Sequence, residues 1–182
     1  MDPVILGQIA LSFGFVPIPL IGKRPVTSRW EQVQPERALG LIKEWRDKGR
    51  CDNVGILCGQ PSGIVVVDID VNKQGVEHWT SLLQQPNHQL PPTFTVRTGS
   101  GGYHYYFLFT GLVTRFKNAN EAIRGLGIDL KTTGGQVVFA GSTHPETKEK
   151  YRVVLNDGFV NGNPMINEIP QWLLALLQPA QL

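Results

Sequence analysis

Two aspartates at the end of an apolar run are the residues of this sequence with the clearest potential for chemistry. Residues 64–70 read Ile-Val-Val-Val-Asp-Ile-Asp. Alternate side chains of a strand point to opposite faces, so Asp68 and Asp70 share one face about 7 Å apart. Such carboxylates repel each other unless a cation or a hydrogen-bond donor lies between them, and a divalent metal is the simplest such cation. The alternative is a strand that merely ends in a polar turn, where Asp is common.

A glycine-rich loop and a histidine form the second group of candidate residues. Gly99-Ser100-Gly101-Gly102 separates two expected strands, and its three glycines leave the backbone N–H groups open to close approach by a ligand. His104 begins the strand just beyond this loop. The pattern has the outline of a phosphate cradle, with Ser100 and His104 as side-chain donors. A lone histidine is more often a structural residue satisfied by a backbone carbonyl, and that alternative stays open.

A third acid follows in residues 125–131, where Asp129 and Lys131 share one face of an expected strand. Residues 134–140 predict an apolar strand that begins at a glycine pair, and a polar loop containing Ser142 and His144 closes it. The sequence therefore predicts an acid beside a cation, followed by further polar side chains.

Two cations near the N-terminus, Lys23 and Arg24, lie in an expected loop rich in Gly and Pro. Paired cations in such a loop more often bind an anion than cations on a helix face do, and phosphate is one candidate. The basic residues of the following helix fit an ordinary solvated face.

The periodicity of the sequence predicts alternating helices and strands that position these residues. The first helix covers residues 4–15, with Asp2 as its N-cap, Pro3 in its first turn and Gly14 at its end. We expect further helices over residues 35–49, 74–83 and 168–177, strands over residues 53–59, 63–70, 93–98, 103–109, 125–131, 134–140 and 151–155, and a less regular stretch over residues 111–123.

Composition bounds the class of protein. The chain has 182 residues, 41% of them hydrophobic, which is enough to bury the core of one globular domain. A net charge of +2 is too mild to indicate a nucleic-acid binder, because such an indication depends on clustering. Cys51 and Cys58 are the only cysteines, too few for a disulfide framework or a four-ligand zinc site. We expect reduced thiols in a cytoplasmic protein, with neither a signal peptide nor a membrane partner.

Taken in order, these segments resemble the archaeo-eukaryotic primase superfamily, and within it the bifunctional primase-polymerase (Prim-Pol) domains of plasmids, phages and mobile elements. The resemblance covers almost the whole chain. It rests on Ile18-Pro19-Leu20 through Lys23-Arg24-Pro25 and Trp30, on Asn53-Val54-Gly55-Ile56 with Gly59, on Asp68-Ile69-Asp70, on Ser100-Gly101-Gly102-Tyr103-His104 with Tyr106-Phe107, and on Ile128-Asp129 with Gly134-Gly135 and Ser142-Thr143-His144.

The resemblance implies roles for these residues. It implies that Asp68, Asp70 and Asp129 are catalytic and bind two Mg²⁺ or Mn²⁺ ions. Nucleotide phosphates would be held by the loop of Ser100, Gly101 and Gly102 and by His104. Strand direction and loop position place Lys131, Ser142 and His144 near the same site, as further expected nucleotide-binding residues. Expected nucleic-acid contacts are Lys23, Arg24, Arg97, Arg115, Lys117 and Arg124.

The fold that the resemblance implies is α+β, an N-terminal αβ unit packed on an RRM-like antiparallel or mixed sheet. We expect one catalytic domain over residues 1–178. Within it the αβ unit covers about residues 1–60, the RRM-like part about residues 61–160, and a C-terminal packing helix about residues 168–177. Residues 179–182 are expected to be a tail.

The implied activity is that of a template-directed nucleotidyltransferase, a DNA polymerase/primase that adds dNTPs or NTPs to a primer 3′-hydroxyl. Its partners would be a single-stranded DNA template with its primer, the nucleotides, and a helicase or accessory primase domain in cis or in trans. Whether primers are also started de novo stays open at this point.

Two other functions compete with this one. A non-catalytic replication-initiator module, or another module that binds nucleic acid or nucleotide, could share the fold, but a pure binding domain gains nothing from clustered carboxylates near phosphates. A metal-dependent phosphohydrolase could use Asp68 and Asp70, but such enzymes typically need further Thr/Ser and Lys elements after the acids. No GxxxxGK[ST] loop is present, so the sequence does not support P-loop ATP hydrolysis.

Overall fold

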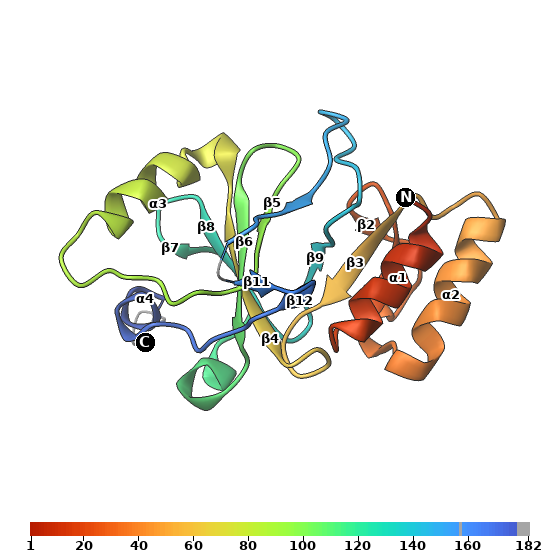
Figure 1. The fold of residues 1–182 in the computed structure, drawn as a ribbon, viewed down its shortest axis with the longest axis horizontal. Coiled ribbons are helices and arrows are strands. Elements are labelled where there is room, and N and C mark those ends of the chain that lie inside the picture. The colour runs from red at the N-terminus through yellow and green to blue at the C-terminus, as the bar shows by residue number, and fades with distance from the viewer. Residues whose placement is uncertain (157, 178–182) are drawn as a thin grey trace.

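The structure is a computed structural model that describes residues 1–156 and 158–177, so the expected tail at 179–182 lies outside the described residues. It confirms the α+β class, with an αβ unit packed against a second sheet (Figure 1). Every pairing between named strands is antiparallel. The α-helices are α1 (Pro3–Ser12), α2 (Pro35–Asp47), α3 (Gly75–Leu83) and α4 (Gln171–Leu176), and the short 3-10 helices are η1 (Trp30–Gln32), η2 (Val71–Lys73) and η3 (Gly111–Arg115). The strands are β1 (Pro17–Ile21), β2 (Arg24–Pro25), β3 (Asn53–Leu57), β4 (Ile64–Ile69), β5 (Thr95–Arg97), β6 (Tyr103–Leu108), β7 (Ala119–Ile123), β8 (Ile128–Lys131), β9 (Gln136–Val138), β10 (Arg152–Val153), β11 (Phe159–Val160) and β12 (Asn163–Pro164).

The N-terminal unit is a four-stranded sheet in the order β2-β1-β3-β9, covered by α1 and α2. Helix α1 begins as predicted, because the Asp2 carboxylate accepts a hydrogen bond from Val4 N at 2.7 Å and Pro3 occupies the first turn. Arg46 of α2 pairs with the same carboxylate at 2.9 Å, which links the two helices. Strand β9 joins this sheet although it lies far along the chain, and it thereby ties the two sheets together.

The second sheet has six strands in the order β10-β5-β6-β4-β8-β7. Strand β4 lies inside it, and both of its faces are buried. Val66 packs into the core between the two sheets, while Val65, Val67 and Ile69 pack into a second core beneath α3 and α4. This burial on both faces explains why the strand is an almost continuous run of β-branched residues.

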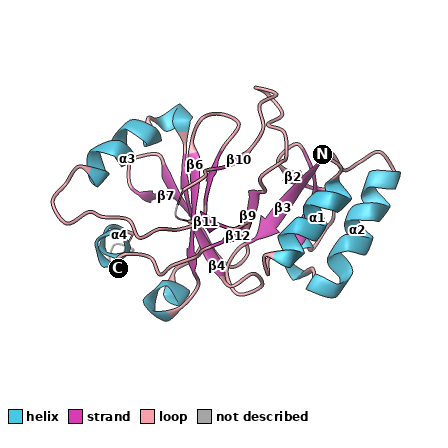
Figure 2. Ribbon diagram, viewed as in Figure 1, coloured by secondary structure: helices cyan, strands magenta, loops and turns pink. Residues whose placement is uncertain are grey.

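The elements stack in layers, with strands in the middle and helices at both ends (Figure 2). Helices α1 and α2 lie at one end and helices α3 and α4 at the other, as Figure 1 also shows. The core between the sheets contains side chains from both of them, including Ile18, Val54, Val66 and Tyr106. Any cavity that opens between the sheets is therefore bounded by segments distant in sequence.

Two parts of the chain depart from the sequence-based prediction. The stretch expected to be irregular, residues 111–123, contains η3 and the edge strand β7. Strand β7 pairs with β8 only at its two ends, and Glu121 in its middle has a φ of 52°, so its side chains do not alternate regularly. The hairpin of β11 and β12 was not predicted either.

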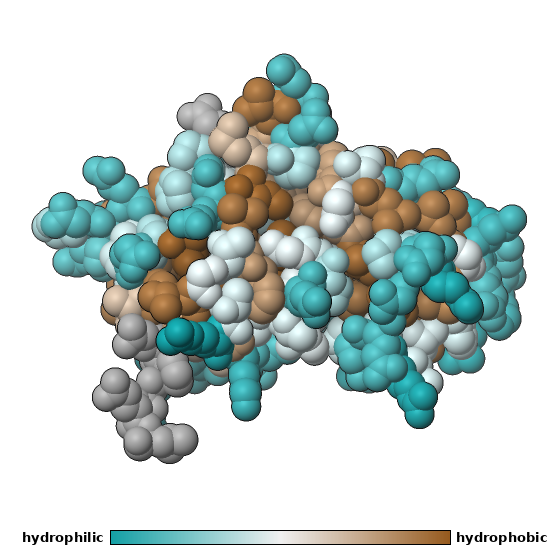
Figure 3. All heavy atoms as spheres, turned by 90° about the horizontal axis from the view of Figure 1, so that it is seen from below, coloured by the Kyte–Doolittle hydropathy of each residue, from teal (hydrophilic) through white to brown (hydrophobic). Residues whose placement is uncertain are grey.

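The surface in view in Figure 3 shows apolar residues in several separate patches between polar side chains. Exposed large apolar residues come from many elements, among them Ile5, Leu112, Leu155 and Met165. Scattered exposure of this kind is ordinary for a globular protein. Among the described residues, the helices are too short or too polar for any of them to cross a bilayer.

Candidate active site

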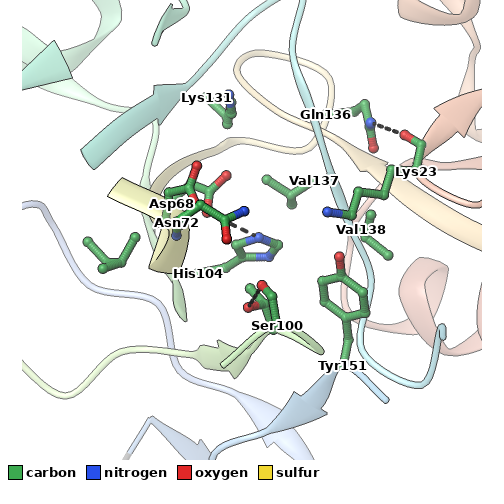
Figure 4. Close-up of a pocket in the computed structure, with 13 residues that line it drawn as sticks. Lys23, Asp68, Asn72, Ser100, His104, Lys131, Gln136, Val137, Val138 and Tyr151 are labelled. Carbon is green, nitrogen blue, oxygen red and sulfur yellow. Dashed lines mark hydrogen bonds and ion pairs between the residues drawn. The ribbon is translucent and has the colours of Figure 1, made fainter. Parts of the chain in front are cut away.

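A cavity of about 260 Å³ opens where the two main sheets meet, and Figure 4 shows the side chains around it. Its walls come from β4, β6, β8 and β9, from the β1–β2 hairpin, from the loop between β5 and β6, and from the segment before β10. The lining residues are Lys23, Asp68, Ile69, Asp70, Asn72, Thr98, Ser100, His104, Lys131, Gln136, Val137, Val138 and Tyr151.

Asp68 occupies the wall of this cavity because three antiparallel strands meet there in register. It is paired with His104 on β6 and with Asp129 on β8. Residues directly opposite each other on antiparallel strands project to the same face, so one face of the sheet carries all three side chains. The gap between His104 Nε2 and Asp68 Oδ1 is 3.5 Å.

Asp70 lies just beyond β4 and lines the same cavity. Its Oδ1 accepts a hydrogen bond from Asn72 N at 2.9 Å, which caps η2. Its backbone is held between Gly127, whose carbonyl accepts from Asp70 N at 2.9 Å, and Gly75, whose N–H donates to Asp70 O at 2.8 Å. A Cβ at Gly75 would lie 2.4 Å from Asp70 O, so this close approach requires glycine.

Asp129 stands beside Asp68, but both of its carboxylate oxygens are engaged. Oδ1 accepts from Glu121 N at 2.7 Å, and Oδ2 accepts from Lys131 Nζ at 3.0 Å. The Lys131 ammonium also donates to Asn120 Oδ1 at 3.1 Å. In this arrangement Asp129 orients Lys131, which lines the cavity, and Asp129 itself does not line it.

The electrostatics of the cavity favour the arrival of a cation. Burial raises the pKa of Asp68, and the nearby Asp129 and Asp70 act in the same direction, while His104 and Lys131 oppose the rise. Burial lowers the pKa of His104, although the Asp68 carboxylate acts against this. The site therefore holds a costly negative charge beside an imidazole that tends to be neutral.

His104 has a hydrogen-bonding atom to spare. Its Nδ1 is buried and lacks a hydrogen-bond partner among the described residues. Figure 4 places the ring between Asp68 on one side and Ser100 and Tyr151 on the other, inside the cavity. His104 lines the cavity, and because buried polar atoms are normally paired, its unpaired ring nitrogen makes it a candidate ligand-binding residue.

The loop of residues 98–102 forms the floor beneath His104. Thr98 Oγ1 accepts from Gly102 N at 2.9 Å and lies 3.1 Å from Ser100 Oγ. A Cβ at Gly102 would be 2.1 Å from Ile69 O, so only glycine lets the loop pack against the end of β4. Gly101 has a φ of 99°, a left-handed conformation that also favours glycine. These glycines therefore place Ser100 next to the acids.

Lys23 enters the cavity from the other sheet. It belongs to the β1–β2 hairpin, and its carbonyl accepts from Gln136 Nε2 at 3.0 Å. Figure 4 shows its side chain extending toward His104 and Tyr151. The sequence predicted an anionic ligand for Lys23 and Arg24, and the structure brings only Lys23 into the cavity.

Sequence reasoning missed four polar residues of the lining. Tyr151 is buried at the cavity, where burial raises the pKa of its phenol. Thr98, Asn72 and Gln136 also face the cavity. Thr98 and Asn72 could have been found, because Thr98 adjoins the glycine loop and Asn72 follows the two acids. Nothing in the local sequence around Tyr151 or Gln136 indicated a site.

Ser142 and His144 lie outside the cavity lining. The Ser142 hydroxyl is fully buried, accepts from Val54 N at 3.1 Å and donates to Val54 O at 3.3 Å, so it ties the loop after β9 to β3. His144 Nδ1 accepts from Glu146 N and Thr147 N, which organises its own loop. Its ring stacks on Tyr151 with 6.1 Å between centroids, so it borders the site through that residue.

The remaining predicted basic residues are spread over the surface. Arg97 lines a neighbouring cavity on the far side of the loop of residues 98–102. The other four are exposed and line none of the cavities described here: Arg24, Arg115, Lys117 and Arg124.

Two of the three predicted carboxylates are available to bind a hard divalent cation, and the third is engaged by Lys131. Asp68 and Asp70 supply carboxylate oxygens, the ligands that Mg²⁺ and Mn²⁺ prefer, and within the described residues neither forms an ion pair with a lysine or arginine. Asp129 Oδ2 becomes available only when Lys131 leaves it. Across residues 1–156 and 158–177, no three His, Cys, Asp or Glu side chains are already gathered around one point as a metal site.

Comparison with known proteins identifies the family of this chain. A family model described as "Bifunctional DNA primase/polymerase, N-terminal" (Prim-Pol) matches residues 8–172, which is most of the chain. Among curated proteins, no relative matches the sequence. The matched span includes Lys23, Asp68, Asp70, the glycine loop and Lys131. The chain therefore belongs to the Prim-Pol family of bifunctional DNA primase/polymerases, nucleotidyltransferases whose substrate classes are DNA and nucleotides.

Proposed function

We propose that this chain adds dNTPs or NTPs to a primer 3′-hydroxyl under the direction of a template, with two divalent cations held by Asp68, Asp70 and Asp129. One observation carries the proposal. In the part of the chain that the structure describes, two carboxylates without a lysine or arginine partner share a cavity with Ser100 of the glycine-rich loop, with His104, whose Nδ1 is unpaired, and with the cation Lys23. A triphosphate and its metal ions would satisfy every one of these groups.

The acids bind and position the metal in this proposal. When bound, Mg²⁺ or Mn²⁺ supplies Lewis acidity at the α-phosphate and lowers the pKa of the 3′-hydroxyl. Asp68 and Asp70 would be its first ligands. Asp129 would join them once the Lys131 ammonium moves from Asp129 Oδ2 to a phosphate. Lys131 would then pair with the phosphate and Asp129 with the metal, so neither charge would be left unpaired.

The polar groups on the opposite wall orient the triphosphate. The Ser100 hydroxyl would donate a hydrogen bond to a phosphate oxygen, and His104 would add another through a ring N–H. The N–H groups of Gly101 and Gly102 already donate to Thr98 O and Thr98 Oγ1, so these two glycines would contribute by shaping the loop that holds Ser100. Lys23 would neutralise charge from the other sheet. The contribution of these residues is positioning and fixed electrostatics rather than covalent chemistry.

The proposal also covers the domain that carries the site and the path of the DNA across it. We take residues 1–178 as one catalytic domain, because the core between the sheets contains side chains of both the αβ unit and the six-stranded sheet. The template and primer would run across the open side of the cavity. A helicase or accessory primase domain would be required only for steps that precede extension.

The test is incorporation of labelled nucleotides on a primed and an unprimed single strand, each with dNTPs and with NTPs, in Mg²⁺ and in Mn²⁺. We expect template-dependent extension of the primed strand, and products on the unprimed strand would add de novo priming. Reactions without template are the control. An electrophoretic shift of the DNA without incorporation in either metal would instead identify a non-catalytic binding module.

A further inference from the structure

A second cavity lies against the loop of residues 98–102, on the side away from the acids. Its volume is about 410 Å³, and it shares Thr98 and Ser100 with the catalytic cavity. It is lined by Arg97, Thr98, Gly99, Ser100, Gly101, Glu149, Lys150 and Arg152. Three cations and one acid therefore surround a space that is one loop away from the proposed reaction centre.

The strand register brings two of these cations together. Arg97 on β5 is paired directly with Arg152 on β10, so both guanidinium groups project to the same face at the edge of the sheet. Like charges directly opposite each other are unfavourable in a sheet, and an anion bound between them would remove the repulsion. Both side chains are exposed, so the repulsion is modest, but it gives the pair a preference for an anionic ligand.

The single acid of the cavity leaves most of this charge uncompensated. Glu149 Oε2 lies 3.6 Å from Arg152 Nη2, but both side chains are more than two-thirds exposed, where such pairs are weak. Lys150 donates to Thr143 Oγ1 at 2.7 Å and to Gly141 O at 3.3 Å, which are neutral acceptors. Within the described residues, Arg97 forms no ion pair.

The backbone of the loop adds hydrogen-bond donors to the cations. The N–H groups of Gly99 and Ser100 donate to no backbone or side-chain acceptor within the described part of the chain. Gly99 packs so closely on the segment after β9 that a Cβ would lie 2.4 Å from His144 Cβ, and its carbonyl accepts from Thr147 Oγ1 at 2.8 Å. The loop is thus fixed in place, with free amides beside the arginines.

An aromatic side chain adjoins the pair of arginines. Tyr103 on β6 is paired with Arg97 across the sheet, so Arg152, Arg97 and Tyr103 form one cross-strand row on the same face. The Tyr103 ring is partly exposed, and its centroid lies 6.0 Å from that of Tyr105. Cations for phosphates beside aromatic rings for bases are the combination that binds single strands.

We propose that this cavity, defined by Arg97, Lys150 and Arg152, is a second phosphate-binding site that holds the backbone of a single-stranded nucleic acid next to the catalytic cavity. The role of the bound strand as a template or primer rests on the proposed function, whereas the binding of its phosphates by these cations does not. It assigns the strand a path along the β5–β10 edge, with the loop of residues 98–102 separating its phosphates from those of the incoming nucleotide.

The test measures binding of a fluorescein-labelled dT20 oligonucleotide by anisotropy, in EDTA and without nucleotide, over a series of salt concentrations. The double variant Arg97→Gln/Arg152→Gln is compared with Arg37→Gln, an exposed arginine of α2, which lies at one end of the molecule and apart from β5. We expect the double variant to bind at least about tenfold more weakly. The slope of log K against log salt should become shallower by about 1.4, because each lost phosphate contact on a single strand removes about 0.7. Arg37→Gln should match the wild type.

A second measurement identifies the source of the phosphate. The nucleotide KM of the double variant, taken at saturating primed template, should stay within about twofold of wild type. Unchanged oligonucleotide affinity and salt slope would overturn the proposal. An increased nucleotide KM with unchanged oligonucleotide binding would also overturn it and would assign the cavity to a triphosphate. Because the binding assay involves no catalysis, a chain that binds through these arginines but incorporates nothing would refute the proposed function alone.

Discussion

At the scale of single residues, the site depends on a few side chains whose normal partners are missing. Among the residues that the structure describes, Asp68 is largely buried with His104 and Lys131 as its nearby compensating groups, and His104 keeps one buried nitrogen without a partner. Unpaired groups of this kind cost stability in the free protein. Their presence together in one cavity is the strongest local evidence for a ligand that completes them.

His104→Ala should raise the KM for the incoming nucleotide by about ten- to a hundredfold, because it removes a hydrogen bond to a charged phosphate. Affinity for the primed template should change much less. Steady-state incorporation at saturating template measures the first quantity, and anisotropy of labelled template measures the second. His88→Ala, which removes an imidazole stacked on Trp172 outside the cavity, is the matched control. An unaltered nucleotide KM would exclude His104 from the site.

Some of these residues could be foreseen and others could not. The alternation of a strand alone placed Asp68 and Asp70 on one face, and the glycine loop indicated Ser100 and His104. Tyr151 could not be predicted, because it reaches the cavity only through the path of the chain after β9. Ser142 and His144 were expected near the nucleotide from strand direction and loop position. Both lie outside the cavity lining, and His144 borders it through Tyr151.

At the scale of elements, the loop of residues 98–102 packs closely against the end of strand β4. The loop reaches the end of β4 only because Gly102 has no side chain, and this contact brings Ser100 beside the acids. The glycines are therefore part of the site although they carry no functional group.

Gly102→Ala should destabilise the fold and reduce incorporation together, because its Cβ would lie 2.1 Å from a backbone oxygen that has little room to move. A loss of about 1–3 kcal/mol or more in the free energy of unfolding is expected. Urea denaturation measures it. Gly40→Ala is the matched control: nothing lies within 4 Å of its Cβ position on α2, so it should stabilise by roughly 0.5–1 kcal/mol. Equal stability of the two variants would contradict the structure of the loop.

The long, regular elements could be predicted from periodicity, whereas the short edge elements could not. Helices α1, α2 and α3 and strands β4 and β6 lie where the sequence predicted them. Strand β7 carries an irregularity that breaks its alternation. The hairpin of β11 and β12 turns at Asn161-Gly162, and both residues have positive φ. Asn-Gly is a favoured pair for such a turn, but the two strands are too short to be recognised by alternation.

At the scale of the whole molecule, the catalytic cavity belongs to neither sheet alone. Lys23 and Gln136 come from the four-stranded sheet, and the acids come from the six-stranded sheet. The shared core that holds the sheets together contains both cysteines. No pattern within one segment could reveal this relation, because β9 pairs with β3, which lies far earlier in the sequence. Reactivity of the thiols therefore reports on the integrity of the whole molecule.

Burial raises the pKa of Cys51 to about 11, from an ordinary value of 9.0, and also raises that of Cys58. Below pH 9 the Cys51 thiol is protonated in both states and contributes no pH dependence. Between about pH 9 and 11 it ionises only after unfolding, so the free energy of unfolding should fall as pH rises, by up to about 1.4 kcal/mol per pH unit. Cys51→Ala should remove this part of the slope in urea titrations from pH 8 to 11. Identical slopes for variant and wild type would show that Cys51 is not buried as described.

The central proposal is that the carboxylates of Asp68 and Asp70 hold the divalent cations for nucleotidyl transfer in the cavity between the sheets. Its most direct test is the single-turnover rate of incorporation by Asp68→Asn and by Asp70→Asn, on primed template with saturating nucleotide, in Mg²⁺ and in Mn²⁺. The exposed acid variant Glu31→Gln is the control, and thermal unfolding of each variant verifies the fold. We predict a loss of at least about 10²-fold for each cavity variant, since even indirect partners of a metal are worth 10- to 100-fold, and no loss for Glu31→Gln. Extension at the wild-type rate by either variant in Mn²⁺ would contradict the claim.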